Sequence, residues 1–343
     1  MRFFGLYALI AVAAAGYSIY WYYLADQTDV LVEQQIETWR NDGLSVSFAD
    51  RRTYGYPYRL SSEVNAFAIG DRDGDDIWNW QGEKLTVYAQ PWNLHHYVAV
   101  LEGVNQIDIL QPGAILRLDA AAESARVSLV LDDDYQAERA SAEFGKLALR
   151  PRDEVTGITA HHAELHARRP DADPNALDAA MIIDGLIIPA GLGGTLGDEV
   201  QNLTLDSSVS GPLPEQLDPA SLAAWRDAGG TVEAHKLAID WGPVRIDADG
   251  TLALDHAFRP LGAMTARVIG HDALIDFLET EGTINDKVAA ALRLTFGLLA
   301  VRPPAGGPAV LTVPITIQDG RLAAGPIPLF EVPPIIPPAK PAS

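Results

Sequence analysis

The N-terminal segment from Phe3 to Ala25 constrains this chain most, because it contains no charged side chain. A helix of about 23 residues, rising about 1.5 Å per residue, is roughly 34 Å long and can cross the hydrocarbon core of a bilayer. The far end of the segment carries an aromatic cluster typical of the lipid headgroup level, made of Tyr17, Tyr20, Trp21, Tyr22 and Tyr23. The sequence therefore predicts a transmembrane anchor over residues 1–25.

Charged residues on both sides of the anchor predict its orientation. Arg2 precedes it, and Asp26, Asp29 and Glu33 follow it. Because basic residues stay on the cytoplasmic side, we expect a single pass through a bacterial inner membrane, with the N-terminus in the cytoplasm and residues 26–343 in the periplasm. A cleaved signal peptide is the alternative, with a cleavage site at Ala13–Ala15. Both interpretations export the body of the protein.

The composition of the chain excludes several classes of protein. Hydrophobic residues make up 48%, which is too many for a disordered chain. The 25 Lys and Arg against 46 Asp and Glu give 25 − 46 = −21, and such an acidic chain is unsuited to binding a phosphate backbone, so we expect no nucleic acid partner. There is no cysteine, which excludes both a disulfide framework and a thiolate site.

The body of the chain has the pattern of a mainly β protein. Residues 26–43 predict a helical stalk in which Val32, Ile36 and Trp39 share one face. From Leu44 onward apolar residues alternate with polar ones, as in half-buried strands. Further alternating runs are Tyr58–Ile69, Lys84–Gln90, Ala114–Asp119, Ala125–Leu131, Gln136–Arg150, Thr159–Ala167, Leu203–Ser210, Thr231–Asp240, Val244–Leu254, Met264–Ile269 and Val310–Gln318. The short turns between them predict curled or sandwich-like antiparallel sheets over residues 44–325.

A few accessory helices and a tail complete the expected organisation. We predict helices over 175–183, over 219–228 with Asp218 as cap, and over the pair 272–279 and 287–299. A sub-boundary of the β-rich domain is expected near 190–220. Residues 326–343 are dense in proline and predict an extended tail.

Clusters of acidic residues and histidines suggest metal sites but do not have the required spacing. In Asp71–Asp76 glycine is fourth, and Gly82 stands where a calcium loop needs its final glutamate, so a hairpin turn is expected. Asp132–Asp134 is interpreted as a turn in the same way. His162 and His166 would share a metal on a helix, but on the strand predicted here they lie roughly 13 Å apart. The adjacent pair His95–His96 faces opposite sides of a strand. We therefore expect neither metal nor cofactor.

No motif for covalent catalysis is present in the sequence. There is no Gly-x-Ser-x-Gly elbow, and Gly191–Gly197 lacks the lysine of a phosphate-binding loop. A glycosidase needs only two carboxylates, which 46 acidic residues leave open. We expect a protein that is not an enzyme and has no catalytic residues, with a hydrolase acting on glycan or lipid as an alternative.

Three stretches of sequence carry a family resemblance. They are Phe48–Leu60 (FADRRTYGYPYRL), Leu85–Tyr97 (LTVYAQPWNLHHY), and Gln318–Leu329 (QDGRLAAGPIPL), the last preceded by Trp241–Leu252 (WGPVRIDADGTL). Together with the anchor, they resemble an uncharacterised family of alphaproteobacterial envelope proteins that looks like a distant member of the AsmA-like group. The resemblance implies one inner-membrane helix and a curled antiparallel sheet with an apolar groove. It also implies a role in moving phospholipid, without any catalytic motif.

Apolar positions at period two are the candidate lining of such a groove, although a packed sandwich core has the same pattern. The candidates for groove or packing residues are Tyr54, Tyr56, Tyr58, Trp78, Trp80, Leu147, Leu149, Leu237, Ile239 and Trp241. We expect a membrane-anchored periplasmic protein that binds or transfers lipid, with phospholipid as ligand. The alternative partners are envelope proteins, bound by a non-catalytic assembly scaffold through its acidic surface and proline-rich tail.

Overall fold

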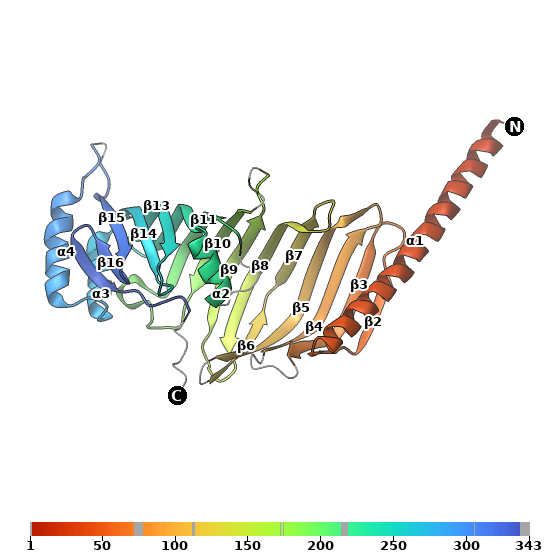
Figure 1. Ribbon diagram of the computed structural model, residues 1–343, viewed down its shortest axis with the longest axis horizontal. Helices are drawn as coiled ribbons and strands as arrows, with labels where there is room; N and C mark the ends of the chain where they lie inside the picture. Colours follow the sequence, from red (N-terminus) through yellow and green to blue (C-terminus); the bar gives the residue numbers. More distant parts are fainter. Residues whose placement is uncertain are drawn as a thin grey trace. The chain divides into compact units, whose positions relative to one another are not determined.

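The computed structural model describes residues 2–71, 78–111, 114–171, 173, 175–213, 219–304 and 306–336 (Figure 1). The chain divides into two compact units, Met1–Gly157 and Ile158–Ser343. The contacts place this division after Gly157, and the sub-boundary near 190–220 stays a prediction. Within both units every strand pairing among the described residues is antiparallel, which confirms the mainly β fold.

The first unit begins with a single long helix, α1 (Arg2–Asn41), which spans the expected anchor and stalk without interruption. Its 40 residues correspond to a length of about 60 Å. Gly43 ends the helix at a φ of 94°, a conformation that glycine adopts without steric cost, and the amide of Asp42 donates to the carbonyl of Thr38. The chain then turns back into the first strand.

The described residues of the first unit form eight strands of one sheet. They are β1 (Leu44–Ser47), β2 (Asp50–Tyr54), β3 (Leu60–Asp71), β4 (Trp78–Gln90), β5 (Asn93–Gln111), β6 (Ala114–Ala121), β7 (Ser124–Leu131) and β8 (Ala137–Pro151). β1 and β2 share one edge of β3, and β4 and β5 follow on its other side. The long strand β5 pairs with both β6 and β7, which in turn both pair with β8.

Irregular backbone at one level interrupts the alternation of side chains in these strands. Ala66 in β3 has a φ of 49°, although the pairing of β3 with β4 keeps one register across it, with Asn65 opposite Lys84 and Phe67 opposite Gly82. At the same level the register between β4 and β5 shifts between Gly82 and Lys84, next to Gly103, which has a φ of 79°. A carboxylate oxygen of Glu83 accepts from the amide of Val104 at 3.1 Å and so satisfies the irregular backbone.

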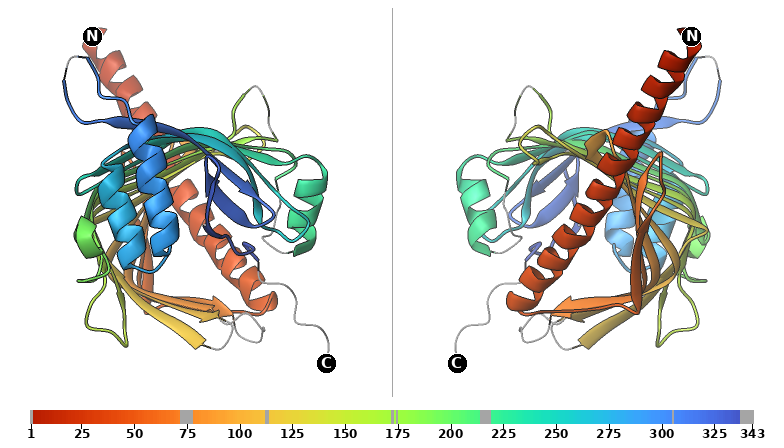
Figure 2. Two further views of the ribbon diagram at one scale, coloured as in Figure 1. Left: turned by 90° about the vertical axis from the view of Figure 1, so that its left-hand side faces the viewer. Right: turned by 90° about the vertical axis from the view of Figure 1, so that its right-hand side faces the viewer.

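The second unit is a meander in which strands pair in sequence order. Its elements are β9 (Ile158–Arg168), β10 (Leu177–Ile187), the 3₁₀ turn Gly194–Leu196, β11 (Glu199–Ser210), α2 (Pro219–Asp227), β12 (Thr231–Trp241), β13 (Val244–Leu254), β14 (Pro260–Ile269), α3 (His271–Thr280), α4 (Asp286–Leu299), β15 (Val310–Gln318), β16 (Arg321–Ala324) and β17 (Ile327–Glu331). Helices α3 and α4 lie side by side (Figure 2). The side chain of Asn285 caps α4 by accepting from the amides of Lys287 and Val288.

Helices α3 and α4 fill the apolar face of strands β13–β15. Ile275 of α3, Leu292 of α4 and Leu311 of β15 are each at most 1% exposed and belong to one hydrophobic cluster. Small residues on the strands, such as Ala248 and Ala266, let the helices approach the sheet closely. In this part of the second unit the apolar sheet face is therefore a packed core.

Several sequence expectations are confirmed, and one is wrong. The helices expected over 219–228, 272–279 and 287–299 are present as α2, α3 and α4, although the expected cap Asp218 lies outside the described residues. The helix expected over 175–183 is instead the first part of β10, because Leu177–Ile187 pairs with β9 on one side and β11 on the other. Pairing on both edges outweighs a weak local preference for helix. Strand β17 lies inside the stretch expected as an extended tail.

Candidate apolar binding site

A cavity of about 510 Å³ lies in the first unit between α1 and one face of the sheet. Eighteen of its 24 lining residues are apolar or aromatic. The volume falls within the range of about 300–1,000 Å³ that is usual for small-molecule sites. The apolar lining consists of Leu24, Leu31, Val32, Ile36, Trp39, Val46, Phe48, Leu60, Val64, Phe67, Ala68, Ile69, Trp80, Leu85, Val87, Ala89, Leu94 and Tyr97.

One face of α1 forms a wall of this cavity. Residues at spacings of three and four, from Leu24 through Val32 and Ile36 to Trp39, place their side chains on that face. The C-terminal half of α1 contacts β1 and β2, and Figure 1 shows it alongside this edge of the sheet. The half of the helix that was expected as a stalk is thus part of the candidate site.

The sheet side of the cavity changes its alternation at Ala66, which has a positive φ. Before Ala66 the residues Leu60 and Val64 line the cavity, and after it Phe67 and Ile69 do. The ring of Phe67 crosses Trp80 edge-on at 4.9 Å and lies over Gly82, where an added Cβ would be 2.4 Å from the ring. With an unbroken alternation past Ala66, the odd-numbered side chains of β3 would continue to point to the opposite face.

Charged and polar groups fasten α1 beside the cavity. Oδ1 of Asp29 accepts from Nη1 of Arg51 at 2.8 Å and from the hydroxyl of Thr53 at 2.7 Å. Glu33 lies one turn further along, 3.7 Å from the same guanidinium. Arg51 is the one charged residue of the described lining, and its charge is neutralised by carboxylates of the helix.

A second set of contacts fastens α1 one to two turns before the cavity. Trp21 is buried, and its indole donates to the carbonyl of Arg59 at 3.1 Å. The hydroxyl of Tyr17 donates to the carbonyl of Pro57, and that of Tyr20 donates to the carbonyl of Pro91 at 2.9 Å. The helix is therefore held at its middle by the β2–β3 and β4–β5 connections.

The structure distributes the candidate residues of the first unit over both faces of the sheet. Trp80 lines the cavity, and the strand register places Trp78, Leu147 and Leu149 on the same face. Tyr54 lies on the other face, where its hydroxyl donates to Glu63 at 3.2 Å.

The two remaining candidate tyrosines, Tyr56 and Tyr58, belong to the β2–β3 connection, whose Pro57 and Arg59 carbonyls accept hydrogen bonds from α1. The ring of Tyr56 stacks on Tyr22 at 5.6 Å and meets Trp21 edge-on at 5.5 Å. Tyr58 is 77% exposed. Neither of them is among the residues that line the cavity.

The candidates of the second unit lie on the face that α3 and α4 cover. Leu237 packs against the hydrophobic cluster of this unit, and Ile239 is half-buried two residues further along β12. The ring of Trp241 meets Phe277 of α3 at 5.1 Å, and its indole donates to the carbonyl of Gly197 at 2.7 Å. These contacts are packing within the unit.

Sequence reasoning missed most of the cavity lining. The face of α1 was recognised at Val32, Ile36 and Trp39 but was assigned to a stalk. Residues Val64, Phe67, Leu85 and Val87 of β3 and β4 were not singled out. The alternation of apolar residues in these strands was visible, but an alternating pattern does not show which other element of the protein will cover the apolar face.

Glu63, on the opposite face of the sheet, is the most buried acidic side chain of the first unit. Burial alone would raise the pKa of this carboxyl, but hydrogen bonds from Asn65 and Arg52 outweigh it and hold the pKa below its ordinary value. Lys84 lies 3.7 Å from Glu63 and 2.8 Å from Glu102. The carboxylate is thus paired with two cations, Arg52 and Lys84.

The histidines of β9 lie on a strand, as expected. His162, Glu164 and His166 share one face, and Glu164 accepts from both imidazoles, at 2.6 and 2.8 Å. The hydrogen bonds from His162 and His166 lower the pKa of Glu164. Among the described residues no group of three or more His, Cys, Asp or Glu is arranged to hold a metal ion.

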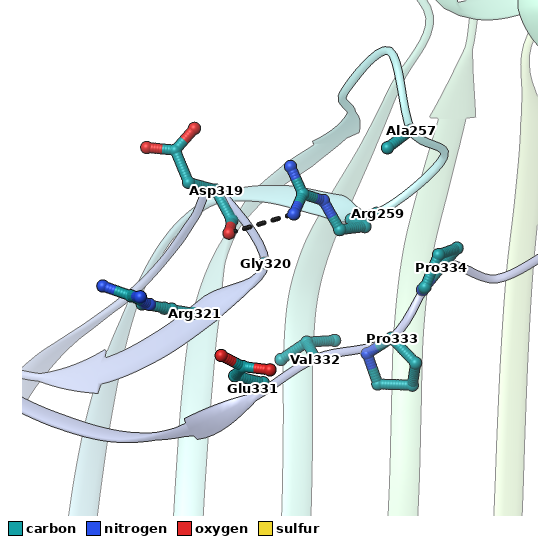
Figure 3. Close-up of a pocket in the computed structure, with 9 residues that line it drawn as sticks. All are labelled: Ala257, Arg259, Asp319, Gly320, Arg321, Glu331, Val332, Pro333 and Pro334. Atoms are coloured by element: carbon teal, nitrogen blue, oxygen red, sulfur yellow. Dashed lines mark hydrogen bonds between the residues drawn. The ribbon is translucent and has the colours of Figure 1, made fainter.

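A hollow of about 660 Å³ in the second unit is lined by residues of the β16–β17 region and of the turn before β14 (Figure 3). Arg259 pairs with Asp255 at 2.7 Å and donates to the carbonyl of Asp319 at 3.1 Å. Arg321 and Glu331 stand opposite each other in neighbouring strands. The charges in this hollow are balanced, because its two arginines, Arg259 and Arg321, stand with Asp319 and Glu331.

Comparison with known proteins adds one finding. The model of a family described as "Uncharacterized protein conserved in bacteria (DUF2125)" matches residues 21–333. No curated protein matches the chain. The matched region starts at the buried Trp21 and includes the cavity, the strands of both units and helices α2–α4.

Proposed function

This chain belongs to the DUF2125 family of bacterial proteins, and we propose that it is a membrane-anchored protein of the cell envelope that holds a lipid acyl chain between α1 and the sheet. The observation that carries the proposal is the cavity of about 510 Å³ with its apolar lining. The resemblance of the sequence to a family that looks like a distant member of the AsmA-like group, whose larger members are implicated in moving phospholipid, supports the same ligand class.

The physical basis of this binding is removal of hydrocarbon from water. Each buried methylene contributes about 0.8 kcal/mol, so a long acyl chain can be held without any covalent step. A charged ligand is disfavoured, because Arg51 is already paired with carboxylates of α1. We therefore propose a carrier and not an enzyme.

The proposed location follows from α1. This helix is long and apolar enough to span a membrane, which is compatible with a single-pass anchor. Arg2 before the apolar stretch and Asp26 after it support an orientation with the N-terminus in the cytoplasm and the β-rich body in the periplasm.

Photo-crosslinking of the full-length protein in membranes tests the lipid proposal. Phospholipids carrying a diazirine in the acyl chain are activated by light, and the modified peptides are located by mass spectrometry. We expect adducts on the β3–β4 peptides that carry Val64, Leu85 and Val87. Adducts restricted to residues 2–23 would show only surrounding bilayer lipid. That result would reject the cavity as a lipid site and would favour the assembly scaffold.

A further inference from the structure

The contacts that hold the middle of α1 against the sheet limit the distance that can separate the body of the protein from a membrane spanned by α1. Among the side chains described from Leu6 onward, the first hydrogen bond from α1 to the sheet unit is that of Tyr17 with Pro57. Ser18 follows with a hydrogen bond of 2.7 Å to Tyr56, and Tyr20 bonds Pro91. The body is thus attached to the helix from residue 17 onward.

The length of the free part of α1 does not match a bilayer. From Arg2 to Gly16 there are 15 residues, and these correspond to roughly 22 Å, whereas the hydrocarbon core is about 30 Å thick. Extending the span to Tyr23 gives 22 residues and roughly 33 Å. A tilt shortens the depth that a helix covers and increases the deficit. If α1 spans the membrane, Tyr17–Tyr23 must therefore lie within it or at its interface, together with the connections bound to them.

Side chains around this junction suit an interface. Large aromatic side chains surround α1 here and remain exposed, with Tyr58 at 77% and Trp92 at 62%. Tyrosine and tryptophan concentrate at the headgroup level, because their rings are apolar and their polar atoms stay hydrated. We call the exposed group the aromatic collar, and it consists of Tyr22, Tyr23, Tyr56, Tyr58 and Trp92.

The charge of the two connections is also suited to a lipid surface. Residues 53–62 and 89–101 contain no Asp or Glu, although the whole chain has 46 of them. The charged or titratable groups of these stretches are Arg59, His95 and His96, apart from tyrosines. These stretches therefore bring no carboxylate near anionic lipid headgroups. The rest of the chain is acidic and would be repelled by the same headgroups.

We propose that the aromatic collar docks the β-rich body onto the bilayer, with Tyr58 and Trp92 inserted among the lipid headgroups. This inference rests on the anchoring part of the proposed function, but it does not require lipid in the cavity. The cavity begins at Leu24, the residue after the collar tyrosines of α1. Docking thus brings the cavity to the edge of the leaflet from which an acyl chain would be taken.

The absence of cysteine in the chain allows a direct depth measurement. Tyr58→Cys, Trp92→Cys and Leu9→Cys are each labelled with a nitroxide in the full-length protein. The variants are reconstituted into vesicles of mixed zwitterionic and anionic phospholipid. Power saturation then compares collisions with oxygen, which is enriched in lipid, against collisions with a water-soluble nickel complex. Val155→Cys is the matched control, because Val155 is 96% exposed and follows the end of β8 in the same unit.

We expect the ratio of oxygen to nickel collisions at Tyr58 and Trp92 to exceed that at Val155 several-fold and to approach the ratio at Leu9. A high ratio at Leu9 together with ratios at Tyr58 and Trp92 as low as that at Val155 would overturn docking by the collar. The membrane anchor would then still be supported. If Leu9 also reads as exposed to water, both the anchor and the docking inference are overturned.

Discussion

Asp29 of α1 and Arg51 of β2 join the long N-terminal helix to the sheet, with Nη1 of Arg51 2.8 Å from Oδ1 of Asp29. The arginine side chain is 13% exposed, and its guanidinium also contacts the carbonyl of Asp29 at 3.2 Å. The pair lies where the helix closes over the cavity. The ion pair therefore holds α1 on the sheet and, by doing so, keeps the apolar cavity covered.

Removing this pair is expected to loosen the helix. Asp29→Ala leaves a largely buried guanidinium without its best partner, which costs about 1–3 kcal/mol. We expect faster hydrogen exchange in residues 24–39 and a lower free energy of unfolding of the first unit. Glu37→Ala changes an exposed carboxylate on the same helix and serves as control. Equal exchange rates in the two variants would contradict a role of the pair in holding α1.

Filling the cavity is expected to remove the lipid without unfolding the protein. In Ala89→Trp an indole occupies space beside Leu60 and Tyr97, so photo-crosslinking to diazirine lipid should fall several-fold. The matched control is Gln81→Trp, which adds the same ring at an exposed position of β4. Undiminished crosslinking in Ala89→Trp, with a normal circular dichroism spectrum, would place the lipid elsewhere.

Shortening a leucine side chain is expected to cost much more stability on the buried face of α4 than on its exposed face. Leu292 is 1% exposed and packs in the core, so Leu292→Ala should lower the free energy of unfolding by about 2–5 kcal/mol. Leu298 is 80% exposed on the same helix, and Leu298→Ala should change stability by no more than about 0.5 kcal/mol. Chemical denaturation followed by fluorescence measures both. Similar small effects would mean that this sheet face is not a packed core.

Glu63 is expected to make stability depend on pH in the acid range. Its folded pKa lies below the ordinary value of 4.5, so the folded state favours the ionised carboxylate. The resulting stability is present above pH 4.5 and is lost as the pH falls through the lower folded pKa. We expect the melting temperature of Glu63→Gln to fall less steeply below this pH than that of the native protein. Parallel curves would show that other carboxylates cause the acid sensitivity.

The sequence predicted those features that depend on local pattern. The uncharged run Phe3–Ala25 indicated the apolar part of α1, and the alternation in stretches such as Lys84–Gln90 and Val244–Leu254 indicated strands. The Asp132–Asp134 turn is also confirmed, because Oδ1 of Asp132 accepts from the amides of Asp134 and Gln136. Each of these signals is contained in neighbouring residues.

The site itself depended on contacts between residues far apart in the sequence. Only the fold shows that residues 24–39 of α1 lie on the sheet, that Phe67 and Ile69 line the cavity after the irregular residue Ala66, and that α3 and α4 cover the apolar face of the sheet in the second unit. In all three cases the apolar pattern requires burial but does not specify a partner. The sequence by itself thus determined which faces must leave water, whereas the tertiary structure decided whether a helix, a strand or an empty volume covers them.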